Sequence, residues 1–283
     1  MSMGDVRFRS PENLDEALAM RRRDPEAVVL AGGTDLWPHW ISGGPAPGMV
    51  ISLHRLSQLR RIETEDDFLR VGAACTHTDL VRDETVRRLC PALSEAAATV
   101  GATQIQNRGT IGGNVVNASP AADLPPVLVA VEALLELTSS NGVRQVAIDS
   151  FYRGYRDIDL RPDELLTAVL IPPLPRGARE HFRKVGTRRA QAISKVAGAC
   201  RLELNQDGAI SRVGLAFGSV GPTVIRARDL ERWLEGRRPD LPTAEQAAEK
   251  VKEAVTPMDD LRSTAEYRAH VCGVMVKNWL LDQ

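Results

Sequence analysis

The chain has 283 residues, a formal net charge of −1 and a hydrophobic fraction of 43%. The near-neutral charge gives no general attraction to nucleic acid or to an anionic membrane surface, and no apolar run approaches the roughly 20 residues of a membrane span. The N-terminus MSMGDVRFRSPENLDEA has no apolar signal-peptide core. We therefore expect a soluble cytoplasmic protein of two or three small domains, with neither a membrane nor a nucleic-acid partner.

The N-terminal third, residues 1–55, is predicted to form a small α/β unit. Ser10 is typical of a helix N-cap, and the three arginines Arg21–Arg23 fall near the end of the helix that it would begin. We expect these arginines to complement the helix dipole in solvent, with a phosphate contact as the alternative. Strands are predicted at 27–30 and 50–53, and the first of them leads directly into a glycine-rich turn.

The middle portion, residues 56–174, is predicted to mix helices with strands. Asn141-Gly142 is a strong signal for a two-residue hairpin turn, so the strands predicted at 134–138 and 143–148 should pair with each other. Further strands are predicted at 71–74 and 165–171, and helices at 92–100 and 126–131.

The C-terminal portion, residues 175–283, is predicted to consist of three strands followed by helices. Ser263 and Glu266 form a capping-box pattern, which predicts the start of the last helix. The strands are expected at 181–185, 196–204 and 209–217, and the helices at 225–235, 243–255 and 263–281.

Two glycine-rich turns are the strongest signals for function. The first is AGGTD at 31–35, directly after a predicted strand, and the second is TIGGN at 110–114. Adjacent glycines let the backbone approach an anion closely with N–H groups aimed inward, and threonine hydroxyls add donors. Either segment alone is compatible with an ordinary turn, but two such turns can clamp one diphosphate, which favours a dinucleotide cofactor. Asp35 would repel a diphosphate, so we interpret it as an organiser of its loop.

Several other kinds of site have no matching motif. Neither a Walker lysine motif nor a G-x-G-x-x-G fingerprint is present, so a dinucleotide would need a different fold. The four cysteines, Cys75, Cys90, Cys200 and Cys272, form no C-x-x-C pair and are interpreted as reduced core thiols. We therefore predict no metal ligands, no iron–sulfur cluster and no nucleophilic catalytic arrangement on this chain.

Three segments taken together resemble a known family: AGGTDL after the first predicted strand, TIGGNVVNASPAADLPP in mid-chain and FRKVGTRRAQAISKV later. They are similar to the FAD-binding (medium) subunit of the molybdenum hydroxylases, the xanthine dehydrogenase and carbon monoxide dehydrogenase family. The resemblance covers essentially the whole chain. It implies an α+β fold, in which a two-subdomain FAD-binding fold of the PCMH type precedes a C-terminal domain of a three-stranded sheet plus helices. The expected domains are residues 1–55, 56–174 and 175–283.

The resemblance also implies a set of residues that bind FAD non-covalently. Asp123 would hydrogen-bond the ribityl or phosphate-linked region, with an N-cap role as the alternative. Lys184 would lie near the N1/C2=O edge of the flavin, with a solvated strand lysine as the alternative, and Leu166 would pack on the ring system. His77 is interpreted as a structural histidine, with a flavin-edge contact as the alternative. The implied set is Leu30, Ala31, Gly32, Gly33, Thr34, Asp35, Leu36, Gly101, Thr110, Ile111, Gly112, Gly113, Asn114, Asp123, Leu166 and Lys184.

The function implied by the resemblance is that of an electron relay with no catalytic residue of its own. FAD would receive electrons from [2Fe-2S] clusters on a small partner subunit, while the organic substrate reacts at a molybdopterin centre on a large partner subunit. An external acceptor, which is NAD+, oxygen, a quinone or another protein, would then take the electrons. Gln191 stands where the xanthine dehydrogenase relatives place an acidic residue, which puts NAD+ specificity in doubt. The assembly would be a hetero-oligomer, such as a dimer of heterotrimers.

Two alternative functions stay open at this point. A self-contained FAD-linked oxidase of the vanillyl-alcohol type would need an added substrate domain and usually a covalent flavin, and the chain looks too short for it. A scaffolding subunit without flavin is the other alternative. The absorption spectrum of the purified protein would separate these alternatives from the relay.

Overall fold

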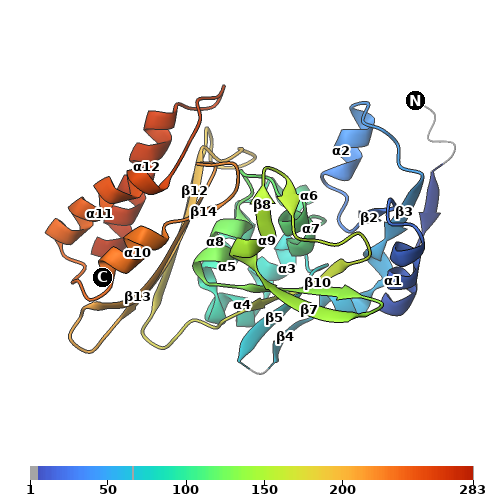
Figure 1. Ribbon diagram of the computed structural model, residues 1–283, viewed down its shortest axis with the longest axis horizontal. Coiled ribbons are helices and arrows are strands. Elements are labelled where there is room, and N and C mark those ends of the chain that lie inside the picture. The colour runs from blue at the N-terminus through green and yellow to red at the C-terminus, as the bar shows by residue number, and fades with distance from the viewer. Residues whose placement is uncertain (1–5, 66, 283) are drawn as a thin grey trace.

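Three structural units follow one another along the chain in the computed structural model, which describes residues 6–65 and 67–282. Figure 1 shows the N-terminal unit at one end, the C-terminal helices at the other and the middle unit between them. Three clusters of buried apolar side chains correspond mainly to these units. Across the described residues, no helix combines the length and the apolar character that crossing a bilayer requires.

The N-terminal unit is a parallel three-stranded sheet in the order β1-β3-β2. Its first long helix begins after Asn13 rather than after the predicted Ser10, because the Asn13 side chain accepts a hydrogen bond from the N–H of Glu16. A second helix directly follows the first glycine-rich turn and was not predicted. The elements are β1 (Arg7–Arg9), α1 (Leu14–Arg23), β2 (Val28–Leu30), α2 (Leu36–Ile41), β3 (Met49–Ser52) and the 3-10 turns η1 (Leu53–Arg55) and η2 (Ser57–Arg60).

The middle unit is built on an antiparallel sheet in the order β4-β5-β10-β6-β7. Its central strand β10 is buried at all seven positions, which explains why its sequence is an unbroken apolar run. The predicted pairing of these two strands is confirmed, but the two-residue turn is Ser140-Asn141 and not Asn141-Gly142, because Gly142 begins β7 and pairs with Ser139. The strands are β4 (Ile62–Glu65), β5 (Phe68–Gly72), β6 (Leu134–Ser139), β7 (Gly142–Ala147), β8 (Tyr152–Gly154), β9 (Asp157–Ile158) and β10 (Leu165–Ile171).

Seven short helices surround this sheet and connect its strands. They are α3 (His77–Arg82), α4 (Glu84–Leu89), α5 (Pro91–Ala98), α6 (Thr103–Gln106), α7 (Ile111–Val116), α8 (Leu124–Ala130) and α9 (Ile148–Phe151). Two of them matter most for the site. Helix α7 contains the second glycine-rich segment, and α3 begins at a buried histidine that follows the end of β5.

The C-terminal unit contains the three predicted strands, and a two-residue strand adds a fourth in the order β11-β12-β13-β14. The helix predicted at 225–235 therefore begins only at Arg228, because residues 225–226 pair with β13. The last helix is capped by Thr264 and not by the predicted Ser263. The elements are β11 (Arg179–Val185), β12 (Val196–Leu204), β13 (Ile210–Gly218), β14 (Ile225–Arg226), α10 (Arg228–Leu234), α11 (Leu241–Ala254) and α12 (Ala265–Leu281).

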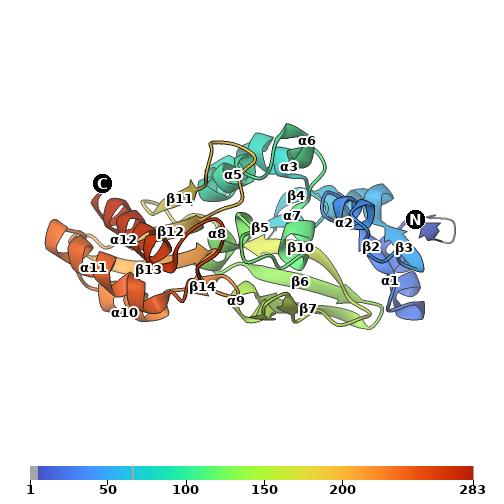
Figure 2. The same ribbon diagram turned by 90° about the horizontal axis from the view of Figure 1, so that it is seen from above.

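The C-terminal sheet is held between two layers of helices. One face packs on α5 and α8 of the middle unit, and the other is covered by α10 and α12, as the view from above shows (Figure 2). A buried glutamate links the two units: Glu180 Oε2 accepts from the N–H of Ala92 in α5 at 3.1 Å, while its Oε1 lies 2.5 Å from Arg201 Nη2 of the neighbouring strand β12. This contact fixes the position of β11 relative to α5.

Candidate cofactor-binding site

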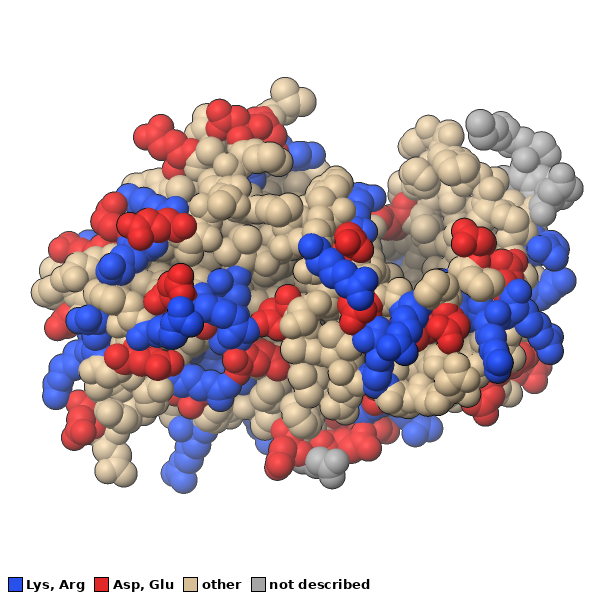
Figure 3. Space-filling model, in the orientation of Figure 1, with Lys and Arg blue, Asp and Glu red and all other residues tan. Residues whose placement is uncertain are grey.

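A cavity of about 560 Å³ lies between the N-terminal and middle units. Three segments form most of its walls: residues 27–36 of the N-terminal unit, and residues 109–117 and 160–166 of the middle unit. Figure 3 shows the surface hollowed between these two units. The two glycine-rich segments, which are far apart in the sequence, thus face the same cavity.

Gly32 and Gly112 permit close packing of backbone on backbone around this cavity. A Cβ atom on Gly32 would lie 2.0 Å from the carbonyl oxygen of Arg108, so only glycine lets the first turn touch the middle unit there. A Cβ on Gly112 would lie 2.6 Å from the carbonyl oxygen of Ala73. These two glycines hold the walls together.

Gly113 has a different role from its neighbour. A Cβ on Gly113 would meet only the hydroxyl oxygen of Thr110, at 3.0 Å, and the rest of that side is open. Because Gly113 also lines the cavity, its missing side chain leaves room for a ligand rather than for protein. The open side of Gly113 therefore leaves its backbone accessible to a ligand in the cavity.

The two turns differ in the backbone donors that they offer. In the second segment the N–H groups of residues 111–114 all donate within the protein, to the carbonyl oxygens of Cys75, Ala73 and Thr110 and to the Thr110 hydroxyl. The expectation that these N–H groups point at a diphosphate is therefore wrong. In the first turn, by contrast, the N–H groups of residues 32–36 donate to no acceptor within residues 6–65 and 67–282. The first turn is therefore the one that offers free backbone donors to an anion.

Side chains of the second segment still face the cavity. Thr110 caps α7 by accepting from the N–H of Gly113 at 3.0 Å, which leaves the hydroxyl proton of this nearly buried side chain available to a ligand. The Oδ1 atom of Asn114 is buried and has no hydrogen-bond partner in the described structure. The second segment therefore contributes one hydroxyl donor and one amide acceptor.

Unpaired buried polar atoms gather at this cavity. In the described part of the chain six buried side-chain nitrogen or oxygen atoms have no hydrogen-bond partner, and three of these belong to cavity residues: Arg21 Nε, His77 Nδ1 and Asn114 Oδ1. A buried polar group without a partner costs about 1–3 kcal/mol. Their clustering indicates that the cavity is built for a polar ligand, and a dinucleotide with a diphosphate, hydroxyls and ring nitrogens fits these donors and acceptors.

His77 is a neutral group at this site. Its side chain is 2% exposed, and burial lowers its pKa to about 4. The imidazole lies against Gly109, where a Cβ would approach its ring to 3.1 Å. The structure thus places the residue that we interpreted as structural in the cavity wall, with Nδ1 unpaired.

Most of the predicted FAD-binding residues line the cavity, but five do not. Leu30 precedes the first turn, Ile111 is buried in the core of the middle unit, and Gly101 accepts a hydrogen bond from the N–H of Gln191. Asp123 and Lys184 lie next to the cavity and bind each other. The residues that line it are Ala31, Gly32, Gly33, Thr34, Asp35, Leu36, Thr110, Gly112, Gly113, Asn114 and Leu166.

Asp123 and Lys184 form a buried ion pair with a third member. Lys184 Nζ lies 2.5 Å from Asp123 Oδ2 and also donates to the carbonyl oxygen of Thr99 at 3.0 Å, while Ser194 Oγ donates to Asp123 Oδ1 at 2.6 Å. Both alternatives for these residues are wrong: the lysine is not solvated, and the Asp123 side chain does not cap α8. Burial raises the pKa of Asp123, and the lysine partly opposes that rise. Thr99 connects this pair to the cavity, because the next residue, Val100, lines it.

Other residues line the cavity without having been predicted. Arg21 was expected to complement a helix dipole in solvent, but it is half-buried and donates to the carbonyl oxygens of Pro25 and Ala27. Val100, Ile105, Leu160 and Glu164 also line the cavity. These residues come from connecting loops, from the last turn of α1 and from the one-turn helix α6, where no periodic pattern in the sequence indicates which way a side chain points.

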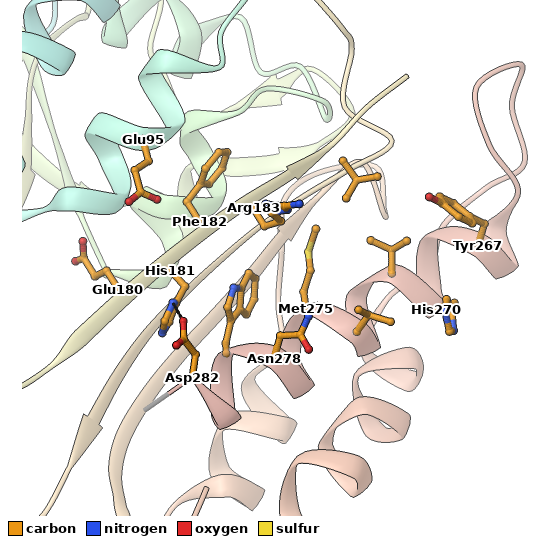
Figure 4. Close-up of a pocket in the computed structure, with 14 residues that line it drawn as sticks. Glu95, Glu180, His181, Phe182, Arg183, Tyr267, His270, Met275, Asn278 and Asp282 are labelled. Atoms are coloured by element: carbon orange, nitrogen blue, oxygen red, sulfur yellow. Dashed lines mark ion pairs between the residues drawn. The ribbon is translucent and has the colours of Figure 1, made fainter. Parts of the chain in front are cut away.

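A second cavity of about 670 Å³ lies in the C-terminal unit (Figure 4). It follows the free edge of β11, with Glu95 and Phe182 on one side of that strand and Met275 and Asn278 of α12 on the other. None of the predicted FAD-binding residues lines it, and it contains no glycine-rich turn. The cavity between the N-terminal and middle units is therefore the candidate cofactor site.

Comparisons with known families match two models that together span almost the entire chain. Residues 4–174 match the FAD binding domain in molybdopterin dehydrogenase. Residues 181–283 match the CO dehydrogenase flavoprotein C-terminal domain. The first match contains every wall of the candidate site.

Individual proteins of known family are similar to this chain over almost its whole length. The chain is 35% identical over 269 residues to the putative xanthine dehydrogenase FAD-binding subunit of Escherichia coli K12, covering 93% of this chain and 91% of the other. It is 31% identical to the glyceraldehyde dehydrogenase medium chain of Sulfolobus acidocaldarius, covering 93% of each. A chain of the carbon monoxide dehydrogenase from Hydrogenophaga pseudoflava, in a form that lacks the Mo-pyranopterin moiety, has a TM-score of 0.92 at 29% identity. That match covers 98% of this chain and 96% of the other.

Proposed function

This chain belongs to the family of FAD-binding subunits of molybdopterin-dependent dehydrogenases, and from that premise we propose that it relays electrons from a partner subunit to an external acceptor. It is an oxidoreductase subunit whose cofactor is FAD. The observation that carries the proposal is the cavity, which has free N–H groups at residues 32–36 and three unpaired polar side chains. These groups bind and orient a cofactor. They do not form an acid–base pair for an organic substrate.

Each wall of the cavity has a separate task in this proposal. The N–H groups of residues 32–36 bind the diphosphate non-covalently, and the Thr110 hydroxyl and Asn114 hold hydroxyl groups beside it. Val100 and Leu166 exclude water from the ring system. Lys184, fixed by Asp123, keeps a positive charge next to the flavin end. When bound, FAD supplies the capacity to take up and release electrons singly or in pairs.

We propose two partners, a small iron–sulfur subunit that delivers the electrons and a large molybdopterin subunit that oxidises the substrate. The names of the relatives support a multi-subunit assembly, since one is called a FAD-binding subunit and another a medium chain. A dimer of heterotrimers is the arrangement that we favour. The four cysteines are buried free thiols, which supports assembly in the reducing cytoplasm.

The relay is tested with the isolated subunit and with the complete complex. We expect the isolated chain to purify with about one FAD, released by acid precipitation, and to oxidise no organic substrate. After the iron–sulfur and molybdopterin subunits are added, the substrate of the complex should bleach the flavin absorbance in stopped flow. Substrate oxidation by the chain alone would favour the self-contained oxidase, and purification without flavin would favour a scaffolding role.

Lys184→Met is expected to lower the reduction potential of the bound flavin. The lost interaction is of the charge-assisted kind, worth about 1.5–3 kcal/mol, which corresponds to about 30–65 mV for a two-electron couple. The Lys184→Met/Asp123→Asn double variant removes both charges and should shift the potential less. Spectroscopic redox titration of the three proteins measures this, and equal potentials would mean that the lysine serves only the fold.

The same substitution has a pH-dependent effect on stability. The pKa of Asp123 is already raised by burial, and losing the lysine removes an influence that lowers it. A carboxyl group with a raised folded-state pKa stabilises the fold below its unfolded pKa, and this stabilisation is lost as the pH rises through the folded value. Lys184→Met should therefore lose more stability at pH 7 than at pH 4, whereas the double variant should not.

A further inference from the structure

Arg21 has a donor that no protein atom uses. The residue lies in the last turn of α1, and its Nη1 atom donates to the carbonyl oxygens of Pro25 at 2.7 Å and Ala27 at 2.6 Å. These bonds hold the guanidinium against the start of β2. The Nε atom is buried without a partner, and the side chain lines the cofactor cavity.

The position of Arg21 identifies one end of the cavity. Figures 1 and 2 both show α1 and α5 on opposite sides of α7, whose first residues line the cavity. Val100, which follows α5, lines the other end of the cavity. That end lies next to Lys184, because Lys184 donates to the carbonyl oxygen of Thr99, the residue before Val100. If the flavin occupies that end, as the proposed function requires, the Arg21 end receives the adenosine half of FAD.

The surroundings of Arg21 suit a flat base with acceptor atoms at its edge. Two apolar residues that line the cavity lie near Arg21: Val28 follows Ala27, whose carbonyl oxygen accepts from Arg21, and Leu165 packs in the same apolar cluster as Ala17 and Leu18 of α1. They offer apolar contact to the faces of a ring. Glu164 also lies at this end, but Arg144 Nε and Nη2 donate to its two oxygens at 2.6 and 2.9 Å. The N–H of Arg161 donates to Glu164 as well, at 2.8 Å. The Glu164 carboxylate is thus already paired with Arg144 and is no partner for Arg21. Among the described residues, Arg21 Nε is the buried donor at the adenosine end that has no hydrogen-bond partner.

We propose that Arg21 donates a hydrogen bond from Nε to an acceptor atom of the adenosine moiety, and so makes this chain select FAD over FMN. The acceptor is a ring nitrogen of adenine or an oxygen of its ribose. Arg21 is then a binding residue that sets cofactor specificity, held in position by two carbonyl oxygens of its own unit. The inference rests on the proposed function, since it assumes that the cavity binds FAD.

Arg21→Met tests this inference, with Arg22→Met as the matched control. Arg22 is the next residue on the same helix and is exposed. Kd values are measured by titrating each apoprotein with FAD, with ADP as the adenosine half and with FMN as the flavin half. We expect Arg21→Met to raise the Kd for FAD and ADP about tenfold, with the Kd for FMN unchanged. Arg22→Met should bind all three ligands as the wild type does.

A purely structural role predicts a different pattern. If the loss of the bonds to Pro25 and Ala27 only loosens the cavity walls, Arg21→Met will raise the Kd for FMN and the Kd for ADP equally, and the proposal fails. Arg21→Lys keeps a cation near these carbonyl oxygens but has no Nε donor. It should therefore show the same loss of affinity for FAD and ADP as Arg21→Met, with little change in melting temperature. An unchanged Kd for ADP in both variants would also overturn the proposal. A wild-type chain that binds no FAD would instead contradict the proposed function.

Discussion

Gly113→Val is expected to lower the affinity for FAD at least about a hundredfold, equal to about 2.7 kcal/mol, while the apoprotein stays folded. The open side of Gly113 faces the cavity, and only the Thr110 hydroxyl lies within contact distance of a Cβ there. A branched side chain would therefore occupy the space that we propose for the diphosphate without clashing with the protein backbone. The cost to the fold should be limited to the lower helix propensity of valine in α7 and a small shift of Thr110.

Flavin content and affinity measure this effect directly. The apoprotein is titrated with FAD while flavin fluorescence is followed, and circular dichroism checks that the melting temperature is preserved. Gly48→Val is the matched control, because no atom lies within 4 Å of a Cβ at that surface position. Stoichiometric FAD at wild-type affinity in Gly113→Val would show that the cofactor does not lie against this segment.

Gly32→Ala is expected to damage both the fold and the cofactor site, although it adds only one methyl group. Its Cβ would lie 2.0 Å from the carbonyl oxygen of Arg108, a backbone atom that cannot rotate away. Relieving the clash requires the first turn to move off the middle unit, at a cost of about 1–3 kcal/mol. The free N–H groups of residues 32–36 would then no longer face the second glycine-rich segment.

The two glycine variants should therefore behave differently. Gly32→Ala should lower the melting temperature of the apoprotein and also weaken FAD binding, whereas Gly113→Val should weaken binding alone. Thermal unfolding with and without FAD, with Gly48→Ala as the reference, separates the two effects. If Gly32→Ala melts at the wild-type temperature and retains FAD, the close packing of the two units does not support the site.

Local sequence patterns predicted the long elements well. Strands β10 and β12 have the predicted bounds, because a buried strand needs a continuous apolar run and a hairpin needs its turn residues. The short helices α2, α4, α6 and α7 were not predicted. A helix of one or two turns has too few residues to show a periodicity of 3.6, and it forms because its neighbours in the fold support it.

The sequence by itself determined the family, the cofactor and the two glycine-rich segments, because these depend on residue types at fixed spacing along the chain. Only the tertiary structure decided which backbone donors remain free: Cys75 and Ala73 take N–H groups of the second segment, while those of residues 32–36 find no acceptor in the described part of the chain. It also paired Lys184 with Asp123, 61 positions away, and turned Arg21 into the cavity. Hydrogen-bond partners and side-chain directions are set by segments that meet only on folding, so no local pattern contains them.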